Sequence, residues 1–295
     1  MQANALPVHS RSRHYNSTKY VISCQDRIST TNPTLKPPMQ KDMHRVLEGI
    51  LEKRKKVAIK LSGSQSIYKE YKIAEELREI PGFILPLCYF ECEDYYTEFP
   101  SKERTSLCKG PGSSIKVIVL PFFEEGSMRS FNWTKKPASL LHSCLLQLIG
   151  SLLQAYETKG IIHSDTHLDN VLLKKTKVRD VEYILDGHKI NISTEGYFIT
   201  IMDFEMSMSE IPTNRGRAIG QVYDDILHAV FDLKYNDTSE IVGDIDLVKT
   251  LMELKLYPVD IYSAWQTLYP LVLKLHTISK AARSFTYDPY NTAMM

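Results

Sequence analysis

The sequence has few of the features that mark several large classes of protein. It contains no run of roughly 18 apolar residues, so we expect no membrane span. Residues 1–20 are polar and lack the apolar segment of a secretory signal. The five cysteines include no C-x-x-C pair, which argues against a zinc site and favours reduced thiols in an intracellular protein, cytoplasmic or nuclear. The formal net charge is +1, so the composition does not indicate direct nucleic-acid binding.

The apolar pattern changes along the chain from strand-like to helix-like. β-branched runs predict strands at 57–61, 115–120 and 197–202, and Asp186-Gly187 predicts the turn of a hairpin over 180–192. Apolar residues three to four positions apart predict helices at 67–77, 138–158, 220–233 and within 244–283. This order favours an α+β enzyme with two lobes. We expect a loose tail at 1–20, an N-lobe at 21–121, a C-lobe at 122–295 and a hinge near 121–127.

The most informative residues lie in IIHSDTHLDNVLL, at 161–173, and IMDFE, at 201–205. Asp165 and Asn170 are five positions apart, and Asp203 follows 33 residues later at the end of an apolar run. Carboxylate and amide oxygens are the ligands that Mg²⁺ prefers, and phosphoryl transfer needs a metal, a phosphate-binding group and an aligned acceptor. This order and spacing resemble the catalytic and metal-binding loops of the protein-kinase-like fold, and the resemblance implies transfer of a phosphoryl group from ATP, with Mg²⁺ at Asn170 and Asp203.

Three short motifs give the sequence a family resemblance. VAIK at 57–60, HSDTHLDN at 163–170 and MDFE at 202–205 are similar to the VAIK, HRDLxxxN and DFG motifs of protein kinases. HSDTHLDNVLLKKT, at 163–176, resembles the atypical haspin-like kinases most closely, and 174–200 fits their hairpin-bearing insertion. The resemblance implies a two-lobed protein-kinase-like fold with a small β-rich N-lobe and a mostly helical C-lobe. It also implies ATP and Mg²⁺ as cofactors and a protein substrate modified on serine or threonine.

The resemblance implies a role for individual residues. Lys60 would contact the α- and β-phosphates and pair with Glu70, for which Glu75 and Glu76 are rivals. Asp165 would act as catalytic base or orient the acceptor hydroxyl, while Asn170 and Asp203 would bind the metal. The segment that ends in Leu120 and Phe122 would bind adenine. His163 would support the loop from below, and Asp225, or its neighbour Asp224, would hold the loop by its backbone.

Three departures from the kinase pattern bear on activity and regulation. Ser164 replaces the arginine of HRD, and the short segment from Asp203 to Asp225 has no APE motif, so we expect no control by activation-loop phosphorylation. Glu205 replaces the glycine of DFG, which removes that residue's freedom at positive φ. No G-x-G-x-x-G precedes Lys60, because residues 41–56 look helical or charged instead. The phosphates would then be covered by a different loop within 18–35, or poorly covered.

Other functions remain open at the level of sequence. HSDTHLDN also resembles the loop of aminoglycoside-phosphotransferase-like small-molecule kinases. The missing glycine-rich loop and Glu205 suit a pseudokinase that acts as a binding module. The alternation of His163, Asp165, His167 and Asp169 suits a metallohydrolase, although further ligands are not evident.

Overall fold

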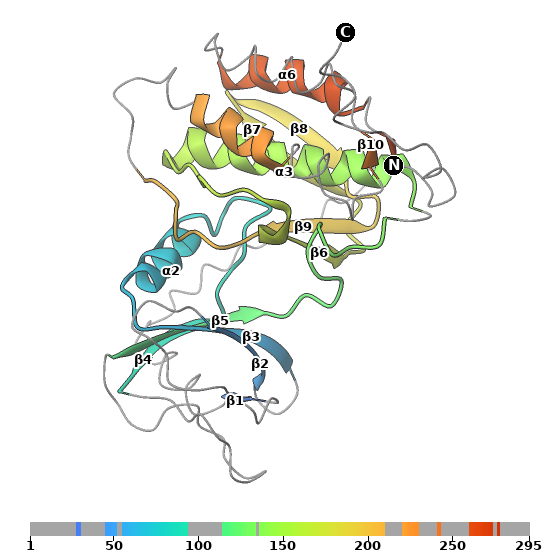
Figure 1. Ribbon diagram of the computed structural model, residues 1–295. Helices are drawn as coiled ribbons and strands as arrows, with labels where there is room; N and C mark the ends of the chain where they lie inside the picture. The colour runs from blue at the N-terminus through green and yellow to red at the C-terminus, as the bar shows by residue number, and fades with distance from the viewer. Residues whose placement is uncertain are drawn as a thin grey trace, which may run out of the picture. The chain divides into compact units, whose positions relative to one another are not determined.

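The computed structural model describes residues 28–30, 45–51, 55–93, 114–133, 136–209, 220–229, 241–242, 260–273 and 276–277. These residues form strands and helices in the order expected, which confirms the α+β class (Figure 1). The chain divides into two units, 1–64 with 87–120, and 65–86 with 121–295. The lobe boundaries and the hinge near 121–127 stay predictions. The tail at 1–20 lies outside the described residues.

The first unit contains one five-stranded sheet. The strand order is β1-β2-β3-β5-β4, and β2 pairs antiparallel with both β1 and β3. β4 pairs antiparallel with β5. The strands are β1 (Ile28–Thr30), β2 (Arg45–Leu51), β3 (Lys55–Ser62), β4 (Cys88–Cys92) and β5 (Ile115–Pro121). The strands expected at 57–61 and 115–120 are therefore confirmed.

The interpretation of 41–56 as helical is wrong for Arg45–Leu51, which is strand β2. Both edges of β2 are occupied by neighbouring strands, and this pairing outweighs the helix preference of its leucine and glutamate residues. The adjacent charges lie on the same hairpin, where Lys56 forms an ion pair of 2.9 Å with Glu48. The loop expected within 18–35 lies outside the described residues except for β1.

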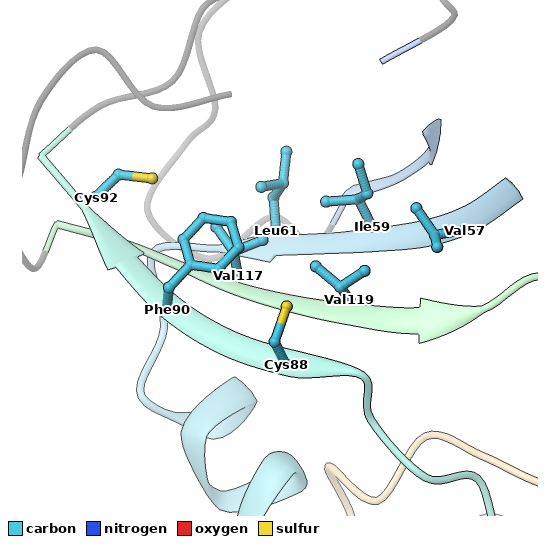
Figure 2. Close-up of a cluster of buried hydrophobic side chains, with 8 residues drawn as sticks. All are labelled: Val57, Ile59, Leu61, Cys88, Phe90, Cys92, Val117 and Val119. Atoms are coloured by element: carbon cyan, nitrogen blue, oxygen red, sulfur yellow. The ribbon is translucent and has the colours of Figure 1, made fainter. Parts of the chain in front are cut away.

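The sheet has two different faces. Alternate residues of β3, β4 and β5 form an apolar cluster on one face, made of Val57, Ile59, Leu61, Cys88, Phe90, Cys92, Val117 and Val119 (Figure 2). Because side chains alternate along a strand, Lys60 and Leu120 belong to the opposite face. Cys88 and Cys92 are each disulfide-bonded, although they lie too far apart on β4 to be bonded to each other. The expectation of reduced thiols is therefore wrong for these two, whereas Cys144 is a free, buried thiol.

In the second unit, helix α2 (Ser66–Glu76) is followed by a segment that runs beside a strand of the same unit. Ile84 N–H donates to the carbonyl of Ile201 at 2.9 Å, and Ile201 N–H donates to the carbonyl of Gly82 at 2.7 Å. Gly82 has a φ of 90°, and a Cβ there would lie 2.0 Å from Ser151 Oγ. A glycine is therefore required at this close approach.

Helix α3 (Ala138–Lys159) forms the centre of the second unit and confirms the helix expected at 138–158. It is followed by Gly160 in the left-handed conformation. Its buried face carries polar side chains among the leucines. The Gln147 amide donates to the carbonyl of Tyr197 at 3.1 Å and accepts from Ile199 N–H at 3.2 Å. Gln147 thus covers one edge of β9 (Tyr197–Ile201), whose other edge pairs with β6 (Val171–Lys175). Gln147 therefore satisfies backbone groups of β9 that the core would otherwise bury without a partner.

The predicted hairpin is confirmed as β7 (Asp180–Leu185) and β8 (His188–Ser193). It lies against α3, where a Cβ at Gly150 would be 3.0 Å from the ring of Tyr183. Tyr183 is fully buried, and its hydroxyl lies 3.3 Å from Ser151 Oγ. The hairpin lies beside helix α6 (Ile261–Val272) (Figure 1). The ring of His188 in β8 stacks on that of Tyr262 in α6, with 3.9 Å between the ring centroids.

The remaining described elements are a helix at 220–229 and the short pair β10 (Ile241–Val242) and β11 (His276–Thr277). In the described part of the chain, α3 is the helix that is long and apolar enough to cross a membrane. Of its most apolar window, 78% is buried inside the protein, as in the core helix of a globular domain.

We predict that Tyr183→Ala lowers the free energy of unfolding by about 3–5 kcal/mol, because it leaves a cavity against Gly150. Ile184→Ala is the matched control, since the neighbouring side chain is 43% exposed on the other face of β7. It should change stability by no more than about 0.5 kcal/mol. Urea titrations followed by circular dichroism measure both, and equal effects would contradict this packing of the hairpin.

Candidate active site

The pairing of β6 with β9 brings the two motif segments together. Asn170 ends the one-turn 3₁₀ helix η1 (Leu168–Asn170) immediately before β6, and Asp203 lies two residues after the end of β9. The strands are antiparallel with Val171 opposite Ile201, so the start of one lies beside the end of the other. The contact continues past the strands, where Met202 N–H donates to the carbonyl of Asn170 at 2.9 Å.

The buried side chain of His163 contacts the backbone of both motif segments. Its Nε2 lies 3.0 Å from the carbonyl of Met202, and its Nδ1 accepts from Asp165 N–H at 3.3 Å. These partners fix the tautomer with the proton on Nε2. The ring meets that of Phe204 edge-on at 5.4 Å, and both side chains are buried. His163 therefore holds the Asp165 loop and the Asp203 loop in one arrangement.

Asp165 and Asn170 are in direct contact. Asn170 Nδ2 donates to the backbone carbonyl of Asp165 at 3.0 Å and lies 3.4 Å from its Oδ2. With its nitrogen used in this way, the amide directs Oδ1 away from Asp165. Asn170 is buried, while the carboxylate of Asp165 is 35% exposed. The loop therefore presents one carboxylate and one amide oxygen, both hard donors.

Asp203 has a left-handed backbone, with φ of 69°. Aspartate tolerates this conformation better than most residues, and such strain is typical of functional loops. Glu205 is not among the residues with positive φ, so the loss of glycine at this position causes no backbone strain. Its carbonyl instead accepts from Lys69 Nζ of α2 at 3.4 Å.

Asp225 contacts the loop from the helix at 220–229. Its Oδ2 accepts from Ser164 N–H at 2.9 Å, and Ser164 also has a left-handed backbone with φ of 65°. Of the two carboxylates considered, Asp225 is buried and Asp224 is exposed. The buried carboxylate thus satisfies a backbone donor that the strained turn would otherwise leave unpaired.

Burial shifts the pKa values of His163 and Asp225, the two buried titratable groups that contact the loop, in opposite directions. It lowers the pKa of His163, although the charge of Asp225 acts against this. It raises the pKa of Asp225, while His163 and the Ser164 N–H act against that shift. The loop therefore fits a neutral imidazole that donates only through Nε2.

The remaining predicted residues lie on the expected elements. Lys60 lies in β3 and Glu70 in α2, and both side chains are buried. Of the rivals, Glu75 contacts Arg78 and Glu76 is exposed, so Glu70 is the inward glutamate of this helix. Leu120 is buried in β5, whereas Phe122 follows the strand and is partly buried. Their roles toward ATP stay predictions.

The sequence did not point to two further charged residues beside the loop. Arg129 Nε lies 2.6 Å from Asp169 Oδ2, and Ser127 Oγ donates to Asp169 Oδ1 at 3.4 Å. Asp169 was considered only as a metallohydrolase ligand, and Arg129 belongs to no motif. Arg129 lies in a turn, and no local sequence pattern there indicates its contact with Asp169, forty positions later.

The metallohydrolase hypothesis gains no support from this geometry. Both ring nitrogens of His163 are already used by backbone groups, so it is not placed to bind a metal. Among the residues that the structure describes, no three His, Cys, Asp or Glu side chains form a metal-binding group.

No family model matches the sequence. Over 97 residues, 32% of this chain, it is 37% identical to serine/threonine-protein kinase haspin of Bos taurus and 38% identical to that of Mus musculus. The matched stretch spans only 12% and 13% of these relatives. A solved structure described as WaaP in complex with acyl carrier protein has a TM-score of 0.44 and 12% identity. The structural alignment covers 86% of this chain and 87% of the chain in that structure.

Over that third of the chain, the match to the two haspins confirms the predicted similarity to protein kinases, and among them to the atypical haspin-like kinases.

We predict that Asp225→Ala lowers the free energy of unfolding by about 1–3 kcal/mol, because the Ser164 N–H loses its buried acceptor. Asp224→Ala, one position away and exposed, is the control and should change stability by about 0.5 kcal/mol or less. Thermal and urea unfolding measure the difference. A larger effect at Asp224 would show that the anchor has been assigned to the wrong carboxylate.

The lowered pKa of His163 predicts a pH-dependent stability. In the unfolded chain histidine titrates near 6.5, whereas the folded protein binds that proton only at lower pH. Between the two pKa values the unfolded state holds more protons, so stability falls as pH drops below 6.5, by up to about 1.4 kcal/mol per pH unit. His163→Gln should reduce this slope. Unfolding titrations from pH 5 to 8 test it, and an unchanged slope would contradict the neutral assignment.

Proposed function

We propose that this chain is an ATP-dependent serine/threonine protein kinase of haspin-like type. The observation that carries the proposal is the convergence of Asp165, Asn170 and Asp203, joined through the Asn170–Met202 bond and through His163. The similarity to two proteins named serine/threonine-protein kinase supports the choice of a protein acceptor. An intracellular location is part of this proposal.

The residues of the site fit a magnesium–nucleotide complex. Asn170 Oδ1 and the Asp203 carboxylate would hold Mg²⁺, because the Asn170 nitrogen is already directed at Asp165. When bound, the ion neutralises charge on the phosphates. Lys60, supported by Glu70, would contact the α- and β-phosphates, and Leu120 and Phe122 would line the adenine site.

Asp165 would act on the acceptor. Its carboxylate accepts a hydrogen bond from the acceptor hydroxyl and takes the proton as the acceptor oxygen bonds to the γ-phosphorus. The bond from the γ-phosphorus to the β–γ bridging oxygen breaks, and its electron pair leaves with ADP. The partial exposure of Asp165, beside the buried Asn170, suits a group that meets a second substrate.

We predict that Asp203→Asn and Asp165→Ala each reduce transfer by at least about 100-fold, for different reasons. Asp203→Asn should weaken Mg²⁺-dependent nucleotide binding, whereas Asp165→Ala should leave ATP affinity nearly unchanged. Asp180→Asn, a half-exposed carboxylate on β7, is the control and should be unaffected. The measurements are transfer of labelled phosphate from Mg-ATP to degenerate Ser, Thr and Tyr peptides, and ATP binding by calorimetry.

The same assay separates the alternatives. Transfer only to small hydroxyl or amino compounds would favour the aminoglycoside-phosphotransferase-like function. ATP binding without any transfer would favour the pseudokinase. Transfer that persists in Asp203→Asn would show that the metal ligands have been assigned wrongly.

A further inference from the structure

Four side chains form a line of opposite charges and dipoles that ends at Asp165. Arg129 Nε lies 2.6 Å from Asp169 Oδ2, and that oxygen lies 3.9 Å from His167 Nδ1. The other ring nitrogen, Nε2, lies 3.7 Å from Asp165 Oδ2. The last two separations are too long for hydrogen bonds but short enough for a carboxylate charge to interact with the imidazole dipole. His167 therefore stands between two carboxylates, one of them the proposed base.

Two hydrogen bonds within the loop hold the backbone of His167. His167 N–H donates to the carbonyl of Asp165 at 3.0 Å, and the carbonyl of His167 accepts from Asn170 N–H at 2.9 Å. The far end of the line is fixed as well, because Met128 N–H, next to Arg129, donates to the carbonyl of Val171 at 2.7 Å. Both ends of the line are thus attached to the start of β6.

The contacts of Asp165 distinguish its two carboxylate oxygens. Oδ2 faces two groups of its own loop, His167 Nε2 at 3.7 Å and Asn170 Nδ2 at 3.4 Å. Asn170 Nδ2 donates to Oδ2, and the imidazole of His167 faces the same oxygen. Because Oδ2 faces the loop, Oδ1 would be the oxygen that meets an incoming hydroxyl.

We infer that His167 is a positioning residue, which holds the Asp165 carboxylate in the orientation that offers Oδ1 to the acceptor. This inference rests on the proposed function. Arg129 acts one step further back, since it fixes Asp169, whose carboxylate faces the buried Nδ1 of His167. The role is separate from metal binding, because Asn170 Oδ1 points away from Asp165.

The neighbouring His228 provides a matched control. Its ring lies 6.2 Å from that of His167, edge-on, and its side chain is exposed. It belongs to the same surface but has no contact with Asp165 in the described structure. Loss of an imidazole at 228 therefore removes a neighbour of the ring without removing the group that faces the base.

The experiment compares His167→Leu, His167→Gln and His228→Gln in the full chain, with Mg-ATP and the degenerate Ser/Thr peptides. His167→Leu should lower kcat about 10- to 100-fold, with KM, ATP affinity and Tm unchanged, because a misplaced base slows only the chemical step. His167→Gln should keep kcat within about threefold, since its amide nitrogen can replace Nε2. His228→Gln should match the wild type.

Arg129→Gln tests the line itself. As a single substitution it should lower kcat by about fivefold. In the His167→Leu background it should lower kcat by less than about twofold, because its effect on Asp165 passes through His167. Additive losses would overturn the connection of Arg129 to Asp165.

Each outcome decides the inference. A wild-type kcat in His167→Leu overturns it and leaves the proposed function standing. A fall in ATP affinity or Tm in both His167 variants also overturns it, since the residue would then support only the fold of the loop. If the wild-type protein transfers phosphate to no acceptor, the proposed function fails and the inference fails with it.

Discussion

The antiparallel pairing of β6 with β9 is the constraint on which the candidate site depends. With Val171 opposite Ile201, the residues before β6 and after β9 must lie side by side. A slip of one residue would turn Leu173 and Ile199, both fully buried, toward the opposite face. The apolar core that surrounds α3 therefore sets the register, and the register brings Asn170 and Asp203 together. The chemistry of the loops is positioned by packing that contains no catalytic residue.

Around this pair the protein maintains a strained loop. Ser164 and Asp203 both have left-handed backbones, a conformation that costs non-glycine residues of order 1–3 kcal/mol each. Asp225 offsets this cost by accepting from Ser164, and His163 does so by bonding both loops. The imidazole of His163 and the carboxylate of Asp225 are both buried, so a change of charge on either would affect the stability of the fold. Stability and site geometry are thus linked through the same few contacts.

The sequence predicted the elements whose pattern is local. β-branched runs identified β3 and β5, the Asp186-Gly187 turn identified the hairpin, and apolar residues three to four positions apart identified α3. It failed for β2, because pairing on both edges decides that strand and no local pattern records it. The motif residues Asp165, Asn170 and Asp203 could be chosen because their spacing is unusual. Arg129 could not, because its contact with Asp169 depends on how the chain before α3 packs against β6.

The central claim is that the loop at Asp165–Asn170 and the carboxylate of Asp203 converge on one metal–nucleotide complex. Paramagnetic Mn²⁺ in place of Mg²⁺ tests this directly, because with ATP it broadens the NMR signals of nuclei near the ion. The account predicts that the Asn170 side-chain amide and the Asp203 backbone amide broaden first, while Ile184 on β7 stays sharp. Broadening of neither Asn170 nor Asp203, with Mn-ATP bound elsewhere on the chain, would contradict it.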